Sequence, residues 1–370
     1  MKTKSIGKSL MLFFISSFAV NVFGQLYIDT TMTPAQLVQN VFVGTGISVN
    51  NVTLSSGTVG MYGSFTGGDS TNLGLNSGII LSTAIDVTKT ANPASFFSSD
   101  SVFFSGDTDF AALTTEKTYD ACVLDFNFIP QSETVSFRYV FGSEEYPDWV
   151  CTKYNDIFAF FITGQNPSGP AYSNTNIALV PGTTFPVAIN TINTGIVGDS
   201  CLLANCSYCT GTNESLIYTQ YFVNNISIGG NTITFNGFTQ VFTATAAVVP
   251  SQQYHMRIGV TDVGDSYYNS GIFLEANSFS ASNVSFVSAA SNEITIYPNP
   301  ADENIIVEIL QKNLLQNNII TICNIHGQLI IQQPIRQAKT EIDIKPLTKG
   351  AYILKVGNAE GMLVKMIVKE

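Results

Sequence analysis

The stretch Ala121-Cys-Val-Leu-Asp-Phe-Asn-Phe128, followed by Thr134-Val-Ser-Phe-Arg-Tyr-Val-Phe141, decides the fold of this chain. Large apolar residues recur at every second position in both segments, which is typical of strands that place one face on a core. The expected inward set is Cys122, Leu124, Phe126, Phe128, Val135, Phe137, Tyr139 and Phe141. Residues 130–133, Pro-Gln-Ser-Glu, form a turn between the segments, so we expect the two strands to pair as an antiparallel hairpin.

The rest of the large N-terminal region also favours strands. Charged residues are only 12% of the chain, whereas β-branched, aromatic and small polar residues are abundant. Residues 157–162, Ile-Phe-Ala-Phe-Phe-Ile, are apolar at every position, which predicts a central strand buried on both faces. Further strands are expected at residues 177–180, 187–189, 233–235, 240–244, 254–260 and 271–275.

One short helix is expected before the strands, because Thr33-Pro-Ala-Gln36 has the pattern of a capping box. No repeat of 20 to 50 residues is evident, which disfavours a propeller or a solenoid. We therefore predict an all-β chain whose large domain is a jelly-roll-like sandwich of two sheets.

Residues 292–370 form a smaller, separate region. Alternating apolar runs at 304–309, 319–325, 328–332, 340–344, 352–356 and 363–368 are separated by Pro, Gly and Asn. Roughly six or seven short strands in this length predict a small immunoglobulin-like sandwich. Small residues before it predict a linker at 281–291.

The N-terminus has the pattern of a signal peptide, predicted at residues 1–24. Lys2, Lys4 and Lys8 precede an apolar run, and Gly24 supplies a small residue at its end. The run of about 13 residues is well short of the ~20 needed to span a bilayer, and no later stretch is long and apolar enough to be a membrane span. We therefore predict no transmembrane segment.

Charge is divided unequally along the chain. Residues 25–291 contain 19 acidic and 5 basic residues, a net charge of −14, whereas residues 292–370 contain 8 of each. A strongly acidic domain is unsuited to binding nucleic acid through phosphates, so no nucleic-acid partner is expected. Cations are the more natural partner.

The C-terminal region carries four recognisable motifs: Ile294-Thr-Ile-Tyr-Pro-Asn-Pro300, Asn324-Ile-His-Gly-Gln328, Lys349-Gly-Ala-Tyr-Ile-Leu-Lys-Val356 and Leu363-Val-Lys-Met-Ile-Val-Lys-Glu370. Their layout resembles the C-terminal sorting domain of the type IX secretion system of Bacteroidetes. The resemblance implies that the secretion machinery recognises residues 292–370 and carries the chain through the periplasm to the outer-membrane cell surface or the medium. It also implies removal of the tail, with attachment to surface lipopolysaccharide as one outcome.

The large region carries several motifs in order: Leu37-Val-Gln-Asn-Val-Phe-Val-Gly44, Ser77-Gly-Ile-Ile-Leu-Ser-Thr83, Tyr139-Val-Phe-Gly-Ser-Glu-Glu-Tyr146, Asn155-Asp-Ile-Phe-Ala-Phe-Phe-Ile162, Asn176-Ile-Ala-Leu-Val-Pro-Gly182 and Asp262-Val-Gly-Asp-Ser266. They resemble the choice-of-anchor L domain, and we place such a domain at residues 25–280. The resemblance implies a surface or secreted role and no known reaction.

Acidic side chains gather in two segments beside expected strands, residues 144–156 and residues 262–269. Calcium takes six to eight oxygen ligands, and these segments offer carboxylates and an amide around a glycine-containing loop. The candidate calcium ligands are Glu144, Glu145, Asp148, Asp156, Asp262, Asp265 and Asn269, with Asp107 and Asp109 as a weaker pair. No EF-hand spacing is present, and the alternative is that these Asp residues only make turns.

Four aromatic residues flank the same acidic segments: Tyr146, Trp149, Tyr267 and Tyr268. Sugar rings stack on such faces, so these residues are the candidate ligand-binding set. The alternative is that their rings only cover the end of the sandwich.

Catalysis has little support in the sequence. Glu144 and Glu145 are adjacent, and adjacent residues of a strand point to opposite faces, so they do not form the carboxylate pair of a glycosidase. The alternative for this pair is that one of them is buried beside an arginine such as Arg138 or Arg257. His255 is expected to face outward from its strand, where it is not a catalytic base. We predict that the protein is not an enzyme.

Six cysteines are present. Cys122 is expected to be a buried free thiol, and Cys323 belongs to the sorting region. The remaining four, Cys151, Cys201, Cys206 and Cys209, are expected to form two disulfides in one of three pairings. The alternative is a zinc site with four sulfur ligands.

These patterns favour an exported binding or adhesion protein, with an extracellular glycan as the preferred ligand. Two alternatives stay open: a secreted hydrolase of polysaccharide or peptide, and a structural component of the extracellular matrix. Two separated carboxylates in a cleft would favour the hydrolase, whereas a shallow aromatic and acidic rim would favour binding.

Overall fold

The computed structural model describes residues 26–92, 103–201, 207–209, 216–226, 233–281, 294–309, 319–324, 329–335, 337–358 and 361–370. The chain divides into two compact units, Met1–Ser282 and Asn283–Glu370. The predicted signal peptide and all but one residue of the predicted linker lie outside the described residues. Strands dominate both units, so the prediction of an all-β chain is confirmed.

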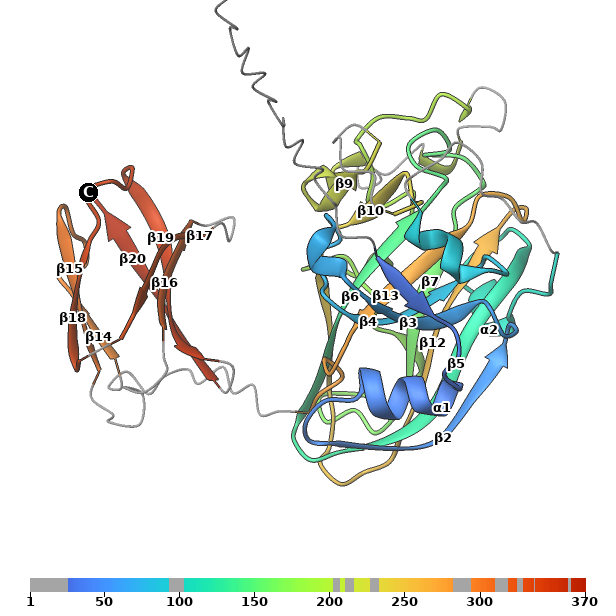
Figure 1. Ribbon diagram of the computed structural model, residues 1–370, viewed down its shortest axis with the longest axis horizontal. Coiled ribbons are helices and arrows are strands. Elements are labelled where there is room, and N and C mark those ends of the chain that lie inside the picture. The colour runs from blue at the N-terminus through green and yellow to red at the C-terminus, as the bar shows by residue number, and fades with distance from the viewer. Residues whose placement is uncertain are drawn as a thin grey trace, which may run out of the picture. The chain divides into compact units, whose positions relative to one another are not determined.

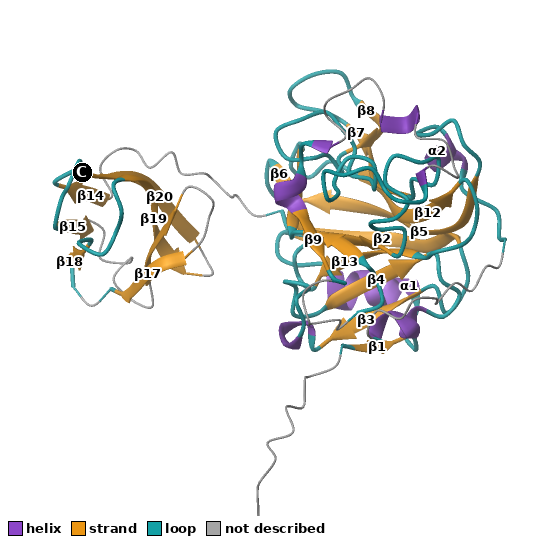
Figure 2. Ribbon diagram, turned by 90° about the horizontal axis from the view of Figure 1, so that it is seen from above, coloured by secondary structure: helices purple, strands orange, loops and turns teal. Residues whose placement is uncertain are grey.

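Two antiparallel sheets form the large unit. The first sheet has the order β1 (Tyr27–Asp29), β3 (Tyr62–Thr66), β4 (Gly78–Ser82), β13 (Ser270–Glu275), β6 (Thr134–Ser143), β10 (Gly237–Thr239) and β9 (Phe222–Asn224), and β11 (Phe242–Ala247) also pairs with β6. The second sheet has the order β2 (Ile47–Ser56), β5 (Thr118–Pro130), β12 (Tyr254–Val263), β7 (Ile157–Gly164) and β8 (Tyr172–Asn176). In Figure 2 the strands β2, β5, β12 and β7 form one layer and β13, β4, β3 and β1 form the other.

Helices are short. The predicted capping box is confirmed, because the Thr33 side chain accepts from Gln36 N and the Gln36 side chain accepts from Thr33 N. Other helical turns serve as connections between strands. The helical segments are α1 (Pro34–Leu37), α2 (Thr108–Ala111), a π-helical turn η1 (Val38–Phe42) and the 3-10 turns η2 (Gly68–Ser70), η3 (Val87–Ala91), η4 (Ser207–Cys209) and η6 (Thr219–Tyr221).

The predicted hairpin between the two deciding strands is wrong. β5 pairs with β2 and β12 in one sheet, whereas β6 pairs with β10, β11 and β13 in the other. Their expected inward residues are nonetheless all buried in one core, at 1% exposure or less. The turn at residues 130–133 therefore carries the chain across the sandwich, and the two apolar faces pack face to face instead of side by side.

Both faces of β7 are buried, as predicted from its uninterrupted apolar run. Phe158, Phe160 and Ile162 lie in the central core, while Ile157, Ala159 and Phe161 contact an outer cluster that α2 covers with Phe110. On the opposite sheet a second outer cluster includes Phe65, Val140 and Phe273. The two extra layers explain why several strands are apolar on both parities.

Three of the predicted strands are absent as strands. Residues 177–180 and 187–189 form only isolated bridges, Leu179 with Pro186 and Ala188 with Ile157, and residues 233–235 form none. Their apolar side chains are buried all the same, because Ala178, Val180, Val187, Ile189, Ile233 and Phe235 are fully enclosed. The apolar pattern thus indicated the burial of these side chains, but the backbone of the three segments forms turns, bends and isolated bridges instead of strands. Sequence reasoning also missed the long strand β2.

The small unit contains two further antiparallel sheets (Figure 1). One has the order β14 (Ile294–Tyr297), β15 (Asn304–Ile309) and β18 (Lys339–Asp343), and the other has the order β17 (Leu329–Pro334), β16 (Ile319–Asn324), β19 (Gly350–Asn358) and β20 (Gly361–Lys369). All six predicted runs are strands. Their shared core includes Ile305, Val307, Ile322, Ile342 and Leu354.

Candidate functional site

Buried acids gather at the end of the large sandwich where β6 and β12 finish and β7 and β13 begin. Antiparallel pairing brings these strand ends together, because Ser143 of β6 pairs with Ser270 of β13 and Thr261 of β12 pairs with Ile157 of β7. We call the carboxylates at this end the acidic cluster; its members are Asp120, Glu144, Glu145, Asp156, Asp262 and Asp265.

Asp156 ties the two sheets together at this end. Its carboxylate accepts from Val263 N of β12 at 2.9 Å and from Ser270 Oγ of β13 at 2.7 Å. The side chain is 1% exposed. Burial raises the pKa of Asp156 to about 7, although both hydrogen bonds act in the opposite direction.

Glu144 fixes two loops to the end of β6. Thr234 Oγ1 donates to Oε1 at 3.0 Å, and Asn269 N donates to Oε2 at 2.9 Å. The backbone of Glu144 also donates to the carbonyl of Asn269. Glu144 is 5% exposed, so both of its oxygens are engaged inside the protein.

Glu145 and Asp262 are buried without such partners. Oε2 of Glu145 and both carboxylate oxygens of Asp262 have no hydrogen-bond partner of good geometry among the described residues, although the Thr83 hydroxyl lies close enough to lower the pKa of Asp262. Burial raises the pKa of both groups well above its usual range, and the negative charge of Asp156 raises each further. Ser266, in the loop between β12 and β13, is likewise buried with its Oγ unpartnered in the described part of the chain.

Sequence reasoning missed Asp120 and Ser266. Asp120 is 1% exposed, accepts from Phe104 N and adds its negative charge to that of Asp262. Strand alternation does not identify it, because a β-bulge between Tyr119 and Cys122 interrupts the alternation at Asp120, whose φ is 47°. Burial raises the pKa of Asp120 as well.

The remaining predicted ligands are less enclosed. Asp148 is exposed and Asp265 is half-buried, whereas Asn269 is buried and hydrogen-bonded to Glu144. Within the described ranges, no group of three or more His, Cys, Asp or Glu side chains is arranged to hold a metal ion. The seven residues predicted from sequence therefore do not form one preassembled ligand set.

Aromatic side chains lie beside the acidic cluster. The Trp149 ring is 5.0 Å from Tyr154 and 6.0 Å from Tyr268. Tyr267 is 48% exposed and its ring is 6.2 Å from that of Phe103, which is 59% exposed. We call the four residues Phe103, Trp149, Tyr267 and Tyr268 the aromatic rim.

Tyr146 does not belong to this rim, in contrast to the prediction. It is fully buried, its hydroxyl donates to Ile192 O at 2.7 Å, and its ring packs 4.8 Å from Phe222. Its position in the sequence, next to the acidic segment, gave no information on its depth.

The turn after β6 also borders a shallow depression of about 190 Å³. Its lining combines two acids, two apolar side chains and small residues: Pro147, Asp148, Thr194, Ile196, Val197, Gly198 and Asp199. Ile196 is 70% exposed, so an apolar surface lies open here.

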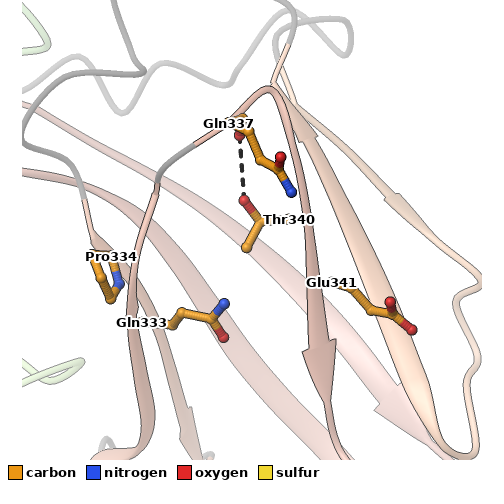
Figure 3. A pocket seen from close by; sticks show the side chains of 5 residues that line it. All are labelled: Gln333, Pro334, Gln337, Thr340 and Glu341. Carbon is orange, nitrogen blue, oxygen red and sulfur yellow. Dashed lines mark hydrogen bonds between the residues drawn. The ribbon is translucent and has the colours of Figure 1, made fainter.

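A second hollow, of about 410 Å³, lies in the small unit (Figure 3). Strands β17 and β18, which edge their respective sheets, provide Gln333 and Pro334 on one side and Thr340 and Glu341 on the other. Thr340 Oγ1 donates to Gln337 O at the rim of the hollow. The lining offers one carboxylate, that of Glu341.

The arginines considered as partners for Glu144 or Glu145 bind elsewhere. Arg138 pairs with Glu275 at 2.7 Å. Arg257 pairs with Asp107 at 2.8 Å, with Asp125 at 3.1 Å and with Asp109. The weaker calcium pair, Asp107 and Asp109, therefore already shares the guanidinium of Arg257.

His255 lies on the same outward face as Arg257. Its side chain is 40% exposed, and Nδ1 is 2.9 Å from Asn127 Oδ1 while Nε2 is 3.2 Å from Asp125. It points away from the core, as predicted, and it is engaged with a strand neighbour.

One disulfide, Cys151–Cys209, joins the turn after β6 to the 3-10 turn η4, so the prediction of a disulfide is confirmed. Cys201 is disulfide-bonded too, and Cys206 lies outside the described residues. The zinc alternative is wrong, because the sulfurs of Cys151 and Cys209 are joined to each other. Cys122 is a buried free thiol, as expected, and burial raises its pKa to about 12.

Family comparison agrees with both resemblances. A model of the choice-of-anchor L domain matches residues 26–280, and a model of the secretion system C-terminal sorting domain matches residues 295–370. The chain belongs to the choice-of-anchor L family. Its type IX sorting tail engages the secretion machinery and directs export to the cell surface or the medium. In the described part of the chain, no helix combines the length and the apolar character needed to cross a membrane.

Solved structures offer only distant similarity. A chain of PorZ, an essential surface component of the type-IX secretion system of Porphyromonas gingivalis, is 14% identical with a TM-score of 0.18, covering 30% of this chain and 15% of that one. A β-glucuronidase of an uncultured Clostridium is 8% identical with a TM-score of 0.19, covering 73% of this chain and 37% of that one. The BSP domain of a biofilm associated protein is 6% identical with a TM-score of 0.19, covering 67% of this chain and 48% of that one.

The chain thus spans less than half the length of each of these three structures. Such low TM-scores carry no functional argument. Comparison with curated proteins gives no match.

Proposed function

We propose that this exported chain is a binding protein without catalytic activity, and that an extracellular glycan contacts the aromatic rim. The observation that carries the proposal is the exposure of Tyr267 and Phe103 at the end of the sandwich where the carboxylates are enclosed. Aromatic faces that remain open to solvent stack on the apolar faces of sugar rings.

The burial of the acids argues against the hydrolase alternative. A glycosidase needs two carboxyl groups that flank the scissile bond at about 5 to 10 Å. Glu144, Asp156 and Asp262 are at most 5% exposed, so a substrate does not reach them in this conformation. Asp148 is exposed, but it lies beside a shallow depression and not in a deep cleft.

Attachment to the cell after export is a second part of the proposal. The sorting tail supports removal of residues 292–370 and transfer of the body to surface lipopolysaccharide. An intact-mass measurement of the product from the producing cell tests this part. We expect a mass lower by the tail and raised by a glycolipid; a product that retains the full tail would contradict it.

A glycan array with the secreted chain tests the binding proposal. Wild-type protein should retain a defined group of glycans, whereas Trp149→Ala and Tyr267→Ala should lose at least tenfold in affinity. Tyr27→Ala is the matched control, because Tyr27 is 65% exposed but lies on β1, outside the rim. Equal binding by all variants would exclude the rim, and no binding by wild type would favour the structural matrix alternative.

A further inference from the structure

Four buried oxygens at the acidic end of the sandwich lack a partner among the described residues: Glu145 Oε2, Asp262 Oδ1, Asp262 Oδ2 and Ser266 Oγ. All three residues are 1% exposed. Buried polar atoms in folded proteins almost always have a hydrogen-bond partner, and an unpaired buried carboxylate is costly. Such a group of atoms is satisfied either by protons or by an outside group with positive charge.

The surroundings do not provide that charge. The charged groups that act most strongly on Glu145 are acids, namely Asp156, Asp265, Asp262 and Glu144. Lys153 acts on the half-buried Asp265, and its ammonium group lies 4.9 Å from the centre of the Tyr154 ring. Within the described ranges, no ion pair reaches Glu145 or Asp262.

Protons alone satisfy this group of atoms only in part. A proton on Asp262 lets this side chain donate to Asp156, and a proton on Glu145 makes that side chain a donor, but neither proton supplies a partner to the Ser266 hydroxyl. A hard cation accepts several oxygens at once, and calcium takes six to eight from carboxylates, hydroxyls, backbone carbonyls and water. The chemistry of the donor set therefore matches calcium.

We propose that Glu145, Asp262 and Ser266 bind one calcium ion at this end of the large unit. Two acids and one hydroxyl form the side-chain part of the site. Such a site does not need three His, Cys, Asp or Glu side chains arranged around a metal, and the described residues contain no group of that kind. Asp156 and Glu144 take no part, because Asp156 holds β12 and β13 together and Glu144 holds the residue before β13.

The ion would order the loop of residues 264–269, which carries Ser266 and, directly after it, Tyr267 and Tyr268. The proposed site has three ligand residues, fewer than the seven predicted from sequence. It is also independent of the glycan proposal, since calcium can bind and stabilise the sandwich whether or not the aromatic rim has a ligand.

Terbium luminescence and thermal unfolding of the secreted chain test the site. Terbium replaces calcium at oxygen sites. The ring of Trp149, the only tryptophan, lies 6.0 Å from the ring of Tyr268 in the loop that carries Ser266, so Trp149 can sensitise terbium emission. After treatment with a chelator, added calcium should raise the unfolding temperature by about 5 to 10 °C at a concentration 100-fold above Kd. Calcium should also displace the terbium.

Asp262→Asn removes a proposed ligand, and Asp148→Asn is the control because Asp148 is exposed beside the same turn. Asp262→Asn should lose at least tenfold in calcium affinity, whereas Asp148→Asn should match wild type. If Asp262→Asn does not fold, Ser266→Ala makes the same test, with an expected loss of about tenfold. An unfolding temperature that ignores calcium and rises only on acidification would overturn the proposal in favour of protonated acids.

Discussion

Replacement of Phe279 by alanine is the most informative change to the core. Phe279 follows β13 and is fully buried. Its ring lies 5.2 Å from Phe42, 5.7 Å from Phe126, 5.1 Å from Phe128 and 5.7 Å from Phe137. Phe126 and Phe128 belong to one sheet and Phe137 to the other, so one ring joins both sheets to the segment before the linker.

The expected cost follows from these contacts. A buried Phe to Ala change destabilises a protein by about 3 to 5 kcal/mol, and aromatic pairs add about 0.5 to 1.5 kcal/mol beyond area burial. We expect a loss near the upper end, about 5 kcal/mol, because four rings lose a partner. At roughly 2 to 4 °C per kcal/mol for a domain of this size, the unfolding temperature should fall by about 10 to 20 °C.

Thermal and urea unfolding of the secreted chain, followed by circular dichroism, measure this loss. Tyr27→Ala serves as the control, since a 65% exposed side chain outside special features changes stability by about 0.5 kcal/mol at most. A loss below about 1 kcal/mol for Phe279→Ala would refute the face-to-face packing of β5 and β6 around this ring.

Further outcomes follow from other contacts. Arg257→Ala should cost about 3 kcal/mol in the free energy of unfolding, because it removes the guanidinium from the buried Asp107 and from the partly buried Asp109 and Asp125, whereas Arg138→Ala, whose side chain is 46% exposed, should cost less than about 1 kcal/mol. Cys151→Ser should destabilise by about 2 to 5 kcal/mol through loss of the disulfide that spans 58 residues. Cys122, with its pKa raised to about 12, should resist alkylation at pH 8 in the native protein and react after unfolding, since only the thiolate is nucleophilic.

The sequence predicted strand content and burial well, but not strand pairing. Alternation placed Leu124 and Phe137 on the core, and both are there. The same alternation is satisfied by a hairpin in one sheet and by two strands in facing sheets, because parity says which face is buried and not which strand is the neighbour. The turn at residues 130–133 places β5 and β6 in facing sheets.

The candidate site was predictable only in its location. The segments around Glu144 and Asp262 do meet, as their positions beside strands suggested. Depth was not predictable, because Asp and Glu are usually exposed and Asp residues commonly make turns. Tyr146 and Tyr268 lie in equivalent sequence contexts, yet Tyr146 fills the core while Tyr268 stays partly exposed beside Trp149.

Binding at the aromatic rim is tested most directly by titrating the strongest array ligand into the secreted chain and into Tyr267→Ala, with mass spectrometry of the recovered glycan. We predict saturable binding by wild type, at least a tenfold weaker Kd for Tyr267→Ala, and an intact glycan after incubation with either protein. An unchanged Kd in the variant, or a glycan cleaved by wild type, would contradict the proposed noncatalytic binding role.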